Sequence, residues 1–232
     1  MTIWAILPAA GIGRRMGSSK PKQYLLVNGV PVISCTLQRL AAVPSVHKIV
    51  VVLHADDGYW SELDIGQDKR IVTTIGGEER SQSVLNGLKF IEPQARADDW
   101  VLVHDAVRPC VRCADIEHLI ASLENHPVGG LLGFPVDNTL KRLDENGNVI
   151  STIDRDACWN ALTPQMYRFG LLLDAIERVV SDSGQATDET AAIERLGHKP
   201  KMIKGSKDNL KITHDSDLVL AGKILEAQDE AI

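Results

Sequence analysis

Short apolar runs and stretches with helical spacing alternate along most of the chain. Ile3–Leu7 and Val46–Leu53 are mainly apolar, the pattern of strands that are buried on both faces of a sheet. Further runs predict strands at 70–75, 100–103, 130–136 and 201–203, and helical spacing predicts helices between Pro31 and Pro44, at 56–63, 80–91, 116–123, 171–180 and 188–196, and from about 216. This alternation predicts an α/β fold with a doubly wound, mostly parallel, Rossmann-like sheet.

Residues 137–158 interrupt the alternation. Two short runs, at 139–143 and 149–153, flank Asn146-Gly147, and this pattern predicts a β-hairpin with a tight Asn-Gly turn. A hairpin inserted into an α/β sheet is either an arm that grips a second subunit or a plain surface excursion. The pattern leaves both interpretations open.

The first strand leads into a glycine-containing loop and a group of cations. Gly11 and Gly13 allow the backbone to approach a ligand and offer it N–H groups. The four cations that follow, without an intervening acid, are Arg14, Arg15, Lys20 and Lys22. Together these features predict a cradle for a polyphosphate. The other interpretation of Arg15 and Lys22 is solvated loop charge.

The glycine spacing excludes two common phosphate loops. A dinucleotide fingerprint needs a third glycine where Met16 stands, and the G-x-x-x-x-G-K-[ST] order is absent from the sequence. Backbone N–H groups with several long cations suit a nucleoside triphosphate whose phosphorus atom is attacked. In such reactions positioning and charge stabilisation dominate the protein's contribution.

Two further polar segments, Gly76–Arg80 and His104–Pro109, follow predicted strands. The carboxyl ends of parallel strands meet at one edge of a sheet, so these segments are expected to converge on one crevice with the glycine loop. Asp105 either binds a metal or ligand hydroxyls or caps a loop. Arg80 reaches phosphate or forms a surface ion pair, and Lys211 points to the crevice or to solvent. Residues 187–189 have the pattern of a helix N-cap followed by acids.

The distribution of charge supports a single anion site. The net charge is −6, yet residues 1–55 carry six Lys or Arg and no Asp or Glu. An acidic chain of this kind argues against nonspecific nucleic-acid binding. The excess of positive charge in residues 1–55 of this acidic chain favours the binding of one anion at one site.

Several other classes of protein find no support in the sequence. Cys110-Val-Arg-Cys113 has neither a second pair nor a close His pair, so we predict ordinary reduced cysteines and a cytoplasmic protein. No His has a legible Ser or Cys partner for a covalent triad. The apolar runs are too short to span a bilayer, and the first residues show no export signal.

An ordered set of motifs makes the chain similar to a known family. These motifs are Pro8-Ala9-Ala10-Gly11-x-Gly13-Arg14-Arg15-Met16, Pro21-Lys22-Gln23-Tyr24, Gly76-Gly77-Glu78-Glu79-Arg80-x-x-Ser83, His104-Asp105-Ala106-x-Arg108-Pro109, Thr163-Pro164-Gln165, Thr187-Asp188-Glu189 and Asp208-Asn209-x-Lys211-Ile212-Thr213. The set resembles the 2-C-methyl-D-erythritol 4-phosphate cytidylyltransferases, from Ile6 to the last helix. Glu78 and Val107 depart from the commoner Asp and Ala, and neither change removes a charge that the chemistry needs.

The resemblance implies a reaction in non-mevalonate isoprenoid precursor biosynthesis. The phosphate of methylerythritol phosphate attacks the α-phosphorus of CTP, and pyrophosphate leaves. Mg²⁺ or another divalent cation is the implied cofactor, held mainly by the triphosphate, with Asp105 as a candidate ligand. The implied organisation is a single nucleotidyltransferase domain over 1–232, with a dimerisation arm at about 137–158. Neither nucleic acid nor membrane is an expected partner.

The resemblance also assigns roles residue by residue. The implied catalytic residues are Arg15, Lys22, Arg155 and Lys211. The implied nucleotide-binding residues are Pro8, Ala9, Ala10, Gly11, Gly13, Gly77, Glu78, Ser83, Asp105 and Ala106. The residues implied to bind methylerythritol phosphate are Arg108, Thr139, Arg155, Thr163 and Lys211. Because the family exchanges its arm across a dimer, Thr139 and Arg155 are expected to serve the partner's site.

Three other functions stay open from the sequence. Ribitol-phosphate cytidylyltransferases share the loop and much of the fold, so the acceptor is less constrained than the nucleotide. A sugar-nucleotide enzyme that uses UTP or ATP is a second alternative. A catalytically silent nucleotide-binding regulator is a third, although Arg15, Lys22, Asp105 and Lys211 argue against it.

Overall fold

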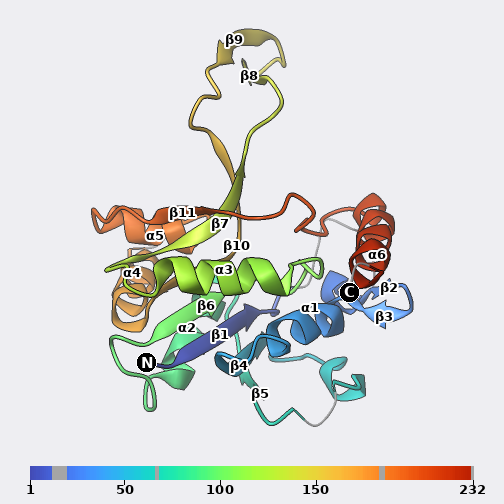
Figure 1. The fold of residues 1–232 in the computed structure, drawn as a ribbon, viewed down its shortest axis with the longest axis vertical. Coiled ribbons are helices and arrows are strands. Elements are labelled where there is room, and N and C mark those ends of the chain that lie inside the picture. The colour runs from blue at the N-terminus through green and yellow to red at the C-terminus, as the bar shows by residue number, and fades with distance from the viewer. Residues whose placement is uncertain (12–19, 66–67, 183–185, 231–232) are drawn as a thin grey trace.

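A seven-stranded sheet with the order β11-β7-β10-β6-β1-β4-β5 forms the centre of the molecule (Figure 1). The computed structural model describes residues 1–11, 20–65, 68–182 and 186–230. The strands are β1 (Ile3–Pro8), β4 (Val46–Leu53), β5 (Ile71–Ile75), β6 (Trp100–Val103), β7 (Gly129–Pro135), β10 (Trp159–Arg168) and β11 (Lys201–Lys204). All neighbours pair in parallel except β10, which runs antiparallel to both β6 and β7. The prediction of a mostly parallel α/β sheet is confirmed.

Helices cover both faces of this sheet. The helices are α1 (Val32–Ala41), α2 (Arg80–Ile91), α3 (Cys113–Leu123), α4 (Phe169–Ser181), α5 (Glu189–Arg195) and α6 (Asp215–Asp229). In β1, Ala5 and Leu7 pack into one core with α1 and α3, whereas Trp4 and Ile6 pack into another with α2, α4 and α5. This division follows from the two-residue period of a strand, and it explains why β1 is apolar throughout.

A third, smaller core holds α6 against α1. It also contains Val27 from the short hairpin β2–β3 (Leu26–Val27 and Val30–Pro31) and Cys110 from the segment after β6. All four cysteines are free thiols, and Cys110 is fully buried. Within the described ranges, none of the helices has the length and apolar character needed to cross a membrane. The cytoplasmic location stays a prediction.

Three local predictions differ from the structure. The segment 56–63 contains only a 3-10 turn at Trp60–Glu62, because the Asp57 side chain accepts hydrogen bonds from the Tyr59 and Trp60 N–H groups and closes a turn instead of a helix. The apolar stretch Leu210-Lys211-Ile212 has the pattern of a short strand in the sequence, but it is not a strand in the structure. Strand β10 was not predicted, because its Pro164 and its polar residues hide the apolar pattern.

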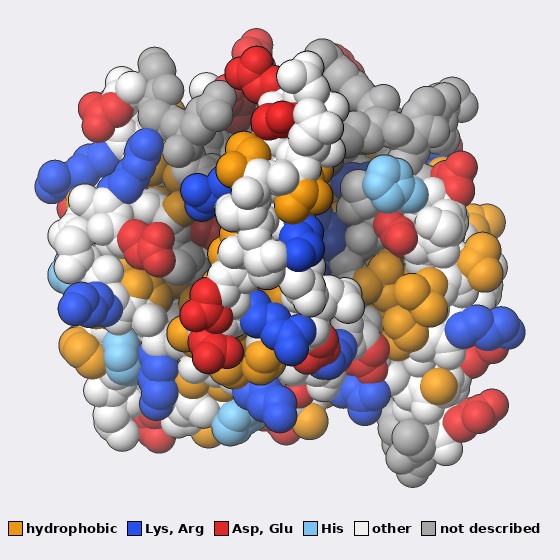
Figure 2. Space-filling model, turned by 90° about the horizontal axis from the view of Figure 1, so that it is seen from above, with side chains coloured by type: hydrophobic (Ala, Val, Ile, Leu, Met, Phe, Trp, Pro, Cys, Tyr) orange, Lys and Arg blue, Asp and Glu red, His pale blue; other side chains and the backbone are white. Residues whose placement is uncertain are grey.

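The predicted hairpin is present and extends away from the sheet as an arm (Figure 1). It consists of β8 (Leu140–Leu143) and β9 (Val149–Ile153), which pair antiparallel. Gly147 adopts a positive φ of 84°, as the tight turn requires. Seen from above, hydrophobic side chains lie open on the arm (Figure 2), and Leu143, Val149 and Ile150 are more than half exposed. We call residues 137–158 the arm below.

Candidate active site

Two adjoining hollows lie at the carboxyl edge of the sheet and share Arg80, Asp105 and Lys211. The first reaches from these residues to Thr163 and Gln165 on β10 and to the start of α5. The second reaches to Pro8 and Ala9 after β1, to Lys22, and to Ala106 after β6. The expected convergence of the segments that follow separate strands is therefore observed. We call this pair of hollows the carboxyl-edge site.

Asp105 lies at the centre of the site and is surrounded by cations. Its Oδ2 is 3.0 Å from Lys211 Nζ and 3.3 Å from Arg108 Nε, and its Oδ1 is 3.2 Å from Arg80 Nε. Burial by itself raises the pKa of the Asp105 carboxyl, but the charges of Arg80, Lys211 and Arg108 outweigh this effect and hold the pKa below its usual range. The site therefore holds an ionised carboxylate and an excess of positive charge, as an anionic ligand requires.

Arg80 is held from behind by a second carboxylate. Its Nη1 and Nη2 donate to the two oxygens of Glu189 at 2.6 and 3.1 Å, and the Glu189 side chain is 1% exposed. Of the two interpretations of Arg80 from the sequence, the structure supports an ion pair, one whose carboxylate is buried and whose guanidinium is partly exposed. Asp188 accepts a hydrogen bond from the Ala191 N–H at 2.8 Å, so the N-cap of α5 lies within the predicted segment 187–189, but at Asp188, one residue after the N-cap that the predicted helix 188–196 implies.

A chain of hydrogen bonds supports the segment that carries Asp105. The Asp105 N–H donates to Thr163 Oγ1, which lies 2.9 Å from His104 Nδ1. His104 Nε2 lies 3.2 Å from the Arg108 carbonyl oxygen. Because a carbonyl can only accept, Nε2 carries the proton and Nδ1 accepts from the Thr163 hydroxyl. Burial lowers the pKa of His104 to about 4, so this histidine is neutral at pH 7.

The glycine pair after β5 packs against the loop after β1. A Cβ at Gly76 would lie 2.7 Å from Ala10 Cβ and 2.7 Å from Ser83 Oγ, so only glycine allows this approach. Ser83 Oγ accepts from the Gly77 N–H at 3.2 Å and fixes the loop. Gln23 Nε2 donates to the Ala9 and Gly11 carbonyls at 2.7 and 3.1 Å. Ala10 and Ser83, both expected to bind the nucleotide, thus lie on either side of Gly76, and Gly77 is hydrogen-bonded to Ser83.

The residues predicted for catalysis and for methylerythritol phosphate, together with Asp105 and Gly13, fall into three groups. The structure gathers Lys22, Asp105, Arg108, Thr163 and Lys211 at the carboxyl edge, and Lys22 Nζ lies 3.4 Å from the Ile212 carbonyl oxygen, beside Lys211. Arg15 and Gly13 lie outside the described residues.

Thr139 and Arg155 form the third group. Both are exposed on the arm, and Arg155 donates to the Asp137 carbonyl. In the part of the chain that the structure describes, neither Thr139 nor Arg155 lines the carboxyl-edge site. The structure of one chain therefore does not bring them to this site.

Sequence reasoning assigned no role to several residues that the geometry now places at the site. Glu189 lies behind Arg80. Asn209 is fully buried, and its side-chain amide donates to the Thr163 backbone carbonyl at 2.7 Å. The backbone carbonyl of Asn209 accepts a hydrogen bond from Arg108. Gln165, which is 1% exposed, donates to Asp188 and accepts from Thr190. All three stood within the quoted motifs, but their partners are distant in sequence and gave no local pattern.

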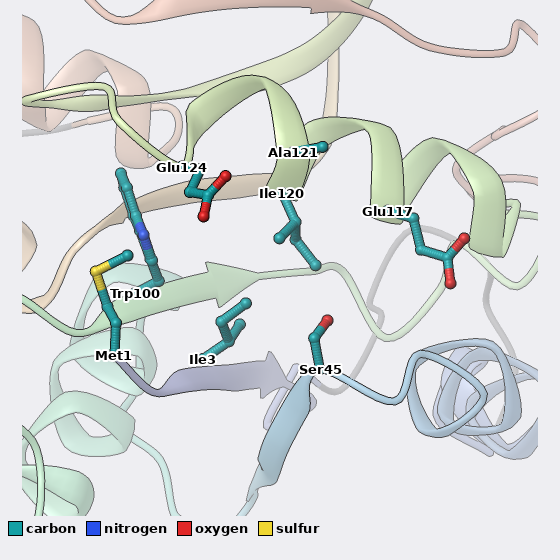
Figure 3. A pocket seen from close by; sticks show the side chains of 8 residues that line it. All are labelled: Met1, Ile3, Ser45, Trp100, Glu117, Ile120, Ala121 and Glu124. Carbon is teal, nitrogen blue, oxygen red and sulfur yellow. The ribbon is translucent and has the colours of Figure 1, made fainter.

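A third hollow, at the amino ends of the strands, is a poor candidate for the same ligand. Figure 3 shows Ile3, Trp100 and Ile120 around it, where β1 and β6 begin beneath α3. Glu117 and Glu124 are the charged side chains of its lining. Two carboxylates repel a phosphate, so this apolar hollow does not suit a nucleotide. We call it the amino-edge hollow.

Comparisons with known proteins agree with this geometry. A model of the family "IspD: 2-C-methyl-D-erythritol 4-phosphate cytidylyltransferase" matches residues 3–227. Relatives named 2-C-methyl-D-erythritol 4-phosphate cytidylyltransferase include one from Hahella chejuensis, 48% identical over 94% of this chain and 91% of the relative. Another, from Tolumonas auensis, is 46% identical over 98% of each chain.

Solved structures show the same likeness. The crystal structure of 2-C-methyl-D-erythritol 4-phosphate cytidylyltransferase from Francisella tularensis is 36% identical, has a TM-score of 0.83, and covers 97% of this chain and 100% of its own. A crystal structure of a 4-diphosphocytidyl-2C-methyl-D-erythritol synthase has the same TM-score at 31% identity, covering 97% of this chain and 98% of its own. With its motifs, its fold and its carboxyl-edge site, the chain belongs to the 2-C-methyl-D-erythritol 4-phosphate cytidylyltransferase family.

Proposed function

We propose that this chain transfers CMP from CTP to 2-C-methyl-D-erythritol 4-phosphate, releasing pyrophosphate and forming CDP-methylerythritol. The observation that carries the proposal is the group of cations Lys22, Arg108 and Lys211 in the hollows around the buried carboxylate of Asp105, in a chain of this family. When one phosphate attacks another, negative charge accumulates around the reacting phosphorus. Preorganised cations that face this charge lower the barrier without forming a bond.

The two hollows divide the substrates between them. The hollow that includes Pro8, Ala9 and Ala106 lies beside the loop after β1, which packs against Gly76, and would hold CTP. The hollow that includes Arg108 and Thr163 would hold the methylerythritol phosphate. Lys211 belongs to both and would therefore lie between the attacking phosphate and the α-phosphate. Lys22, at the nucleotide side, would stabilise the transition state together with Arg15.

The residues present fit a magnesium ion that is bound mainly by substrate. Mg²⁺ is usually held by one or two carboxylates together with the phosphates of a nucleotide. In the described part of the chain, no group of three or more His, Cys, Asp or Glu side chains is arranged to hold a metal, and Asp105 is the carboxylate that faces both hollows. When bound, the cation would neutralise triphosphate charge, and Asp105 would serve as its protein ligand through an oxygen that one of its cationic partners releases.

The activity is tested with purified protein, CTP, Mg²⁺ and one polyol phosphate at a time. We expect pyrophosphate release and CDP-methylerythritol with methylerythritol phosphate. Faster turnover of ribitol 5-phosphate would overturn the choice of acceptor, and a preference for UTP or ATP would overturn the choice of nucleotide. Nucleotide binding without turnover of any acceptor would make the chain a regulator instead.

The arm is proposed to join two subunits. Its exposed apolar side chains, Leu143, Val149 and Ile150, would be covered by a second copy, as apolar surface of this kind favours association. We expect Val149→Asp to give monomers in sedimentation experiments. Val219, on α6, is 71% exposed, and Val219→Asp is the matched control that should leave the dimer intact.

Mixing two inactive variants tests whether Thr139 and Arg155 serve the partner's site. In a mixed dimer of Lys22→Ala and Arg155→Ala chains, the site whose body keeps Lys22 receives an arm that keeps Arg155. Random reassociation of equal amounts should therefore restore about a quarter of the wild-type rate. If Arg155 acts within its own chain, mixing restores nothing.

A further inference from the structure

Glu189 touches neither hollow, yet it is bound to a residue that touches both. Its carboxylate is buried at the first residue of α5, and it accepts two parallel hydrogen bonds from the Nη1 and Nη2 atoms of Arg80. Arg80 borders the two hollows, whereas Glu189 is in the lining of neither. Glu189 therefore acts on a substrate only through Arg80.

Only the Nε side of the Arg80 guanidinium contacts Asp105, because the Nη1 and Nη2 atoms are bound to Glu189. With both Nη atoms engaged by Glu189, Nε donates to Asp105 Oδ1 at 3.2 Å. The second oxygen of Asp105, Oδ2, is contacted by Lys211 Nζ and Arg108 Nε. The two oxygens of Asp105 thus have different partners, and Oδ2 holds the lysine that faces both hollows.

This division would not persist if the Nη edge of Arg80 were free. A guanidinium and a carboxylate prefer two parallel hydrogen bonds, and the Arg80–Glu189 pair already shows this arrangement. Asp105 is already in contact with Arg80 and is almost buried, so it is the carboxylate that a released Arg80 would take in the same way. Such a pair would engage Oδ2 and displace Lys211.

We propose that Glu189 is a positioning residue that keeps Arg80 from taking both oxygens of Asp105, so that Lys211 stays anchored between the two hollows. The inference rests on the proposed function, because it assigns to Lys211 the position between the two reacting phosphates. It gives the Arg80–Glu189 pair a role in the reaction beyond joining α2 to α5.

The decisive experiment compares Glu189→Gln with the double variant Glu189→Gln/Arg80→Met. In the single variant, kcat should fall by about 10- to 100-fold, the range seen for groups that orient the ligands of a site. In the double variant the competing guanidinium is gone, so Lys211 returns to Asp105 and kcat rises above that of the single variant. A merely structural role predicts the opposite, since the second substitution removes a further contact.

A matched control and a second measurement make the result specific. Glu226→Gln removes a carboxylate that pairs with Lys223 at 2.7 Å on α6, and it should leave kcat unchanged. Thermal melting of each variant shows that the assay is run on folded protein. An unchanged kcat for folded Glu189→Gln, or a double variant no more active than the single one, would overturn the inference.

A crystal structure of Glu189→Gln tests the inference without any turnover. We expect two nitrogen atoms of Arg80 on the two oxygens of Asp105, with Lys211 Nζ no longer within hydrogen-bond distance of Oδ2. Lys211 still bound to Oδ2 would refute the positioning role even if the wild-type chain proved to have another activity. The opposite result is also distinguishable. If the wild-type protein does not turn over CTP, but the crystal structure of Glu189→Gln shows Arg80 on both oxygens of Asp105, the proposed function is refuted and the positioning role is not.

Discussion

Strands β1 and β6 begin at the amino-edge hollow and end at the carboxyl-edge site, and the two ends differ in chemistry. At the amino edge, Ile3 and Trp100 pair side by side under α3, and the charged side chains that line the hollow are carboxylates. At the carboxyl edge, the same strands lead to Ala9 and Asp105 among cations. The strand interiors cannot carry this difference because both faces are buried. The connecting segments therefore determine where an anion binds.

The largest expected effect is on stability at the amino edge. Trp100 is 1% exposed, and the Arg168 guanidinium lies 3.6 Å from its ring centroid. Trp100→Ala should lower the free energy of unfolding by about 3–5 kcal/mol, measured by urea denaturation. If this edge has no part in the reaction, kcat below the melting transition should stay near the wild-type value. A large loss of kcat in the folded variant would break the comparison.

A slightly smaller effect is expected on catalysis at the carboxyl edge. Lys22→Ala should lower kcat at least 10²-fold, because a transition-state contact is worth about 3–4 kcal/mol. Removing the charged side chain at the other edge, in Glu117→Gln, should leave kcat unchanged. Steady-state kinetics with CTP and methylerythritol phosphate measure both variants, and equal rates for Lys22→Ala and the wild type would contradict the role of Lys22.

The third expected effect is a pH dependence of the free energy of unfolding, caused by the buried His104 next to Asp105. The pKa of His104 falls from 6.5 to about 4 on folding, so the unfolded chain binds the proton more tightly. Above about pH 6.5 His104 is neutral in both states and does not lower the free energy of unfolding. As the pH falls from 6.5 towards 4, the free energy of unfolding falls by about 3 kcal/mol, because the unfolded chain takes up the proton first. Chemical denaturation at several pH values measures the loss. His104→Gln should flatten the curve in this range, and an unchanged slope would contradict the assignment.

Much of the carboxyl edge could be predicted because its parts are local in sequence. A continuous apolar run followed by glycines indicates β1 and the loop after it without knowledge of the fold. The ion pairs of Arg80 could not be predicted, since its partners Asp105 and Glu189 lie 25 and 109 residues away. From the sequence, an arginine after two glycines is as compatible with solvent as with a buried pair.

Strand β10 could not be predicted either, because the partners of its polar residues are also distant in sequence. Its polar Thr163 and Gln165 are almost completely buried, and they are satisfied by His104 and Thr190 on other elements. A buried strand with these residues and Pro164 has neither an alternating nor a continuous apolar pattern. The hairpin of the arm, by contrast, was predicted because its turn residues determine it locally. Its role in assembly, and the roles of Arg15 and Gly13, stay predictions.

The antiparallel course of β10 has a consequence for how the arm can change in length. β10 pairs with β7 from Trp159 opposite Pro135, at the base of the arm, to Ala161 opposite Gly133, and Thr163 lies in the irregular segment before pairing resumes at Gln165. Inserting or deleting one residue between Trp159 and Thr163 would displace Thr163 from Asp105, whose N–H donates to it. Extra residues at the tip, around Asn146, would leave this register untouched. Evolution and protein engineers can therefore lengthen the arm at its tip, whereas its root is fixed by the catalytic machinery.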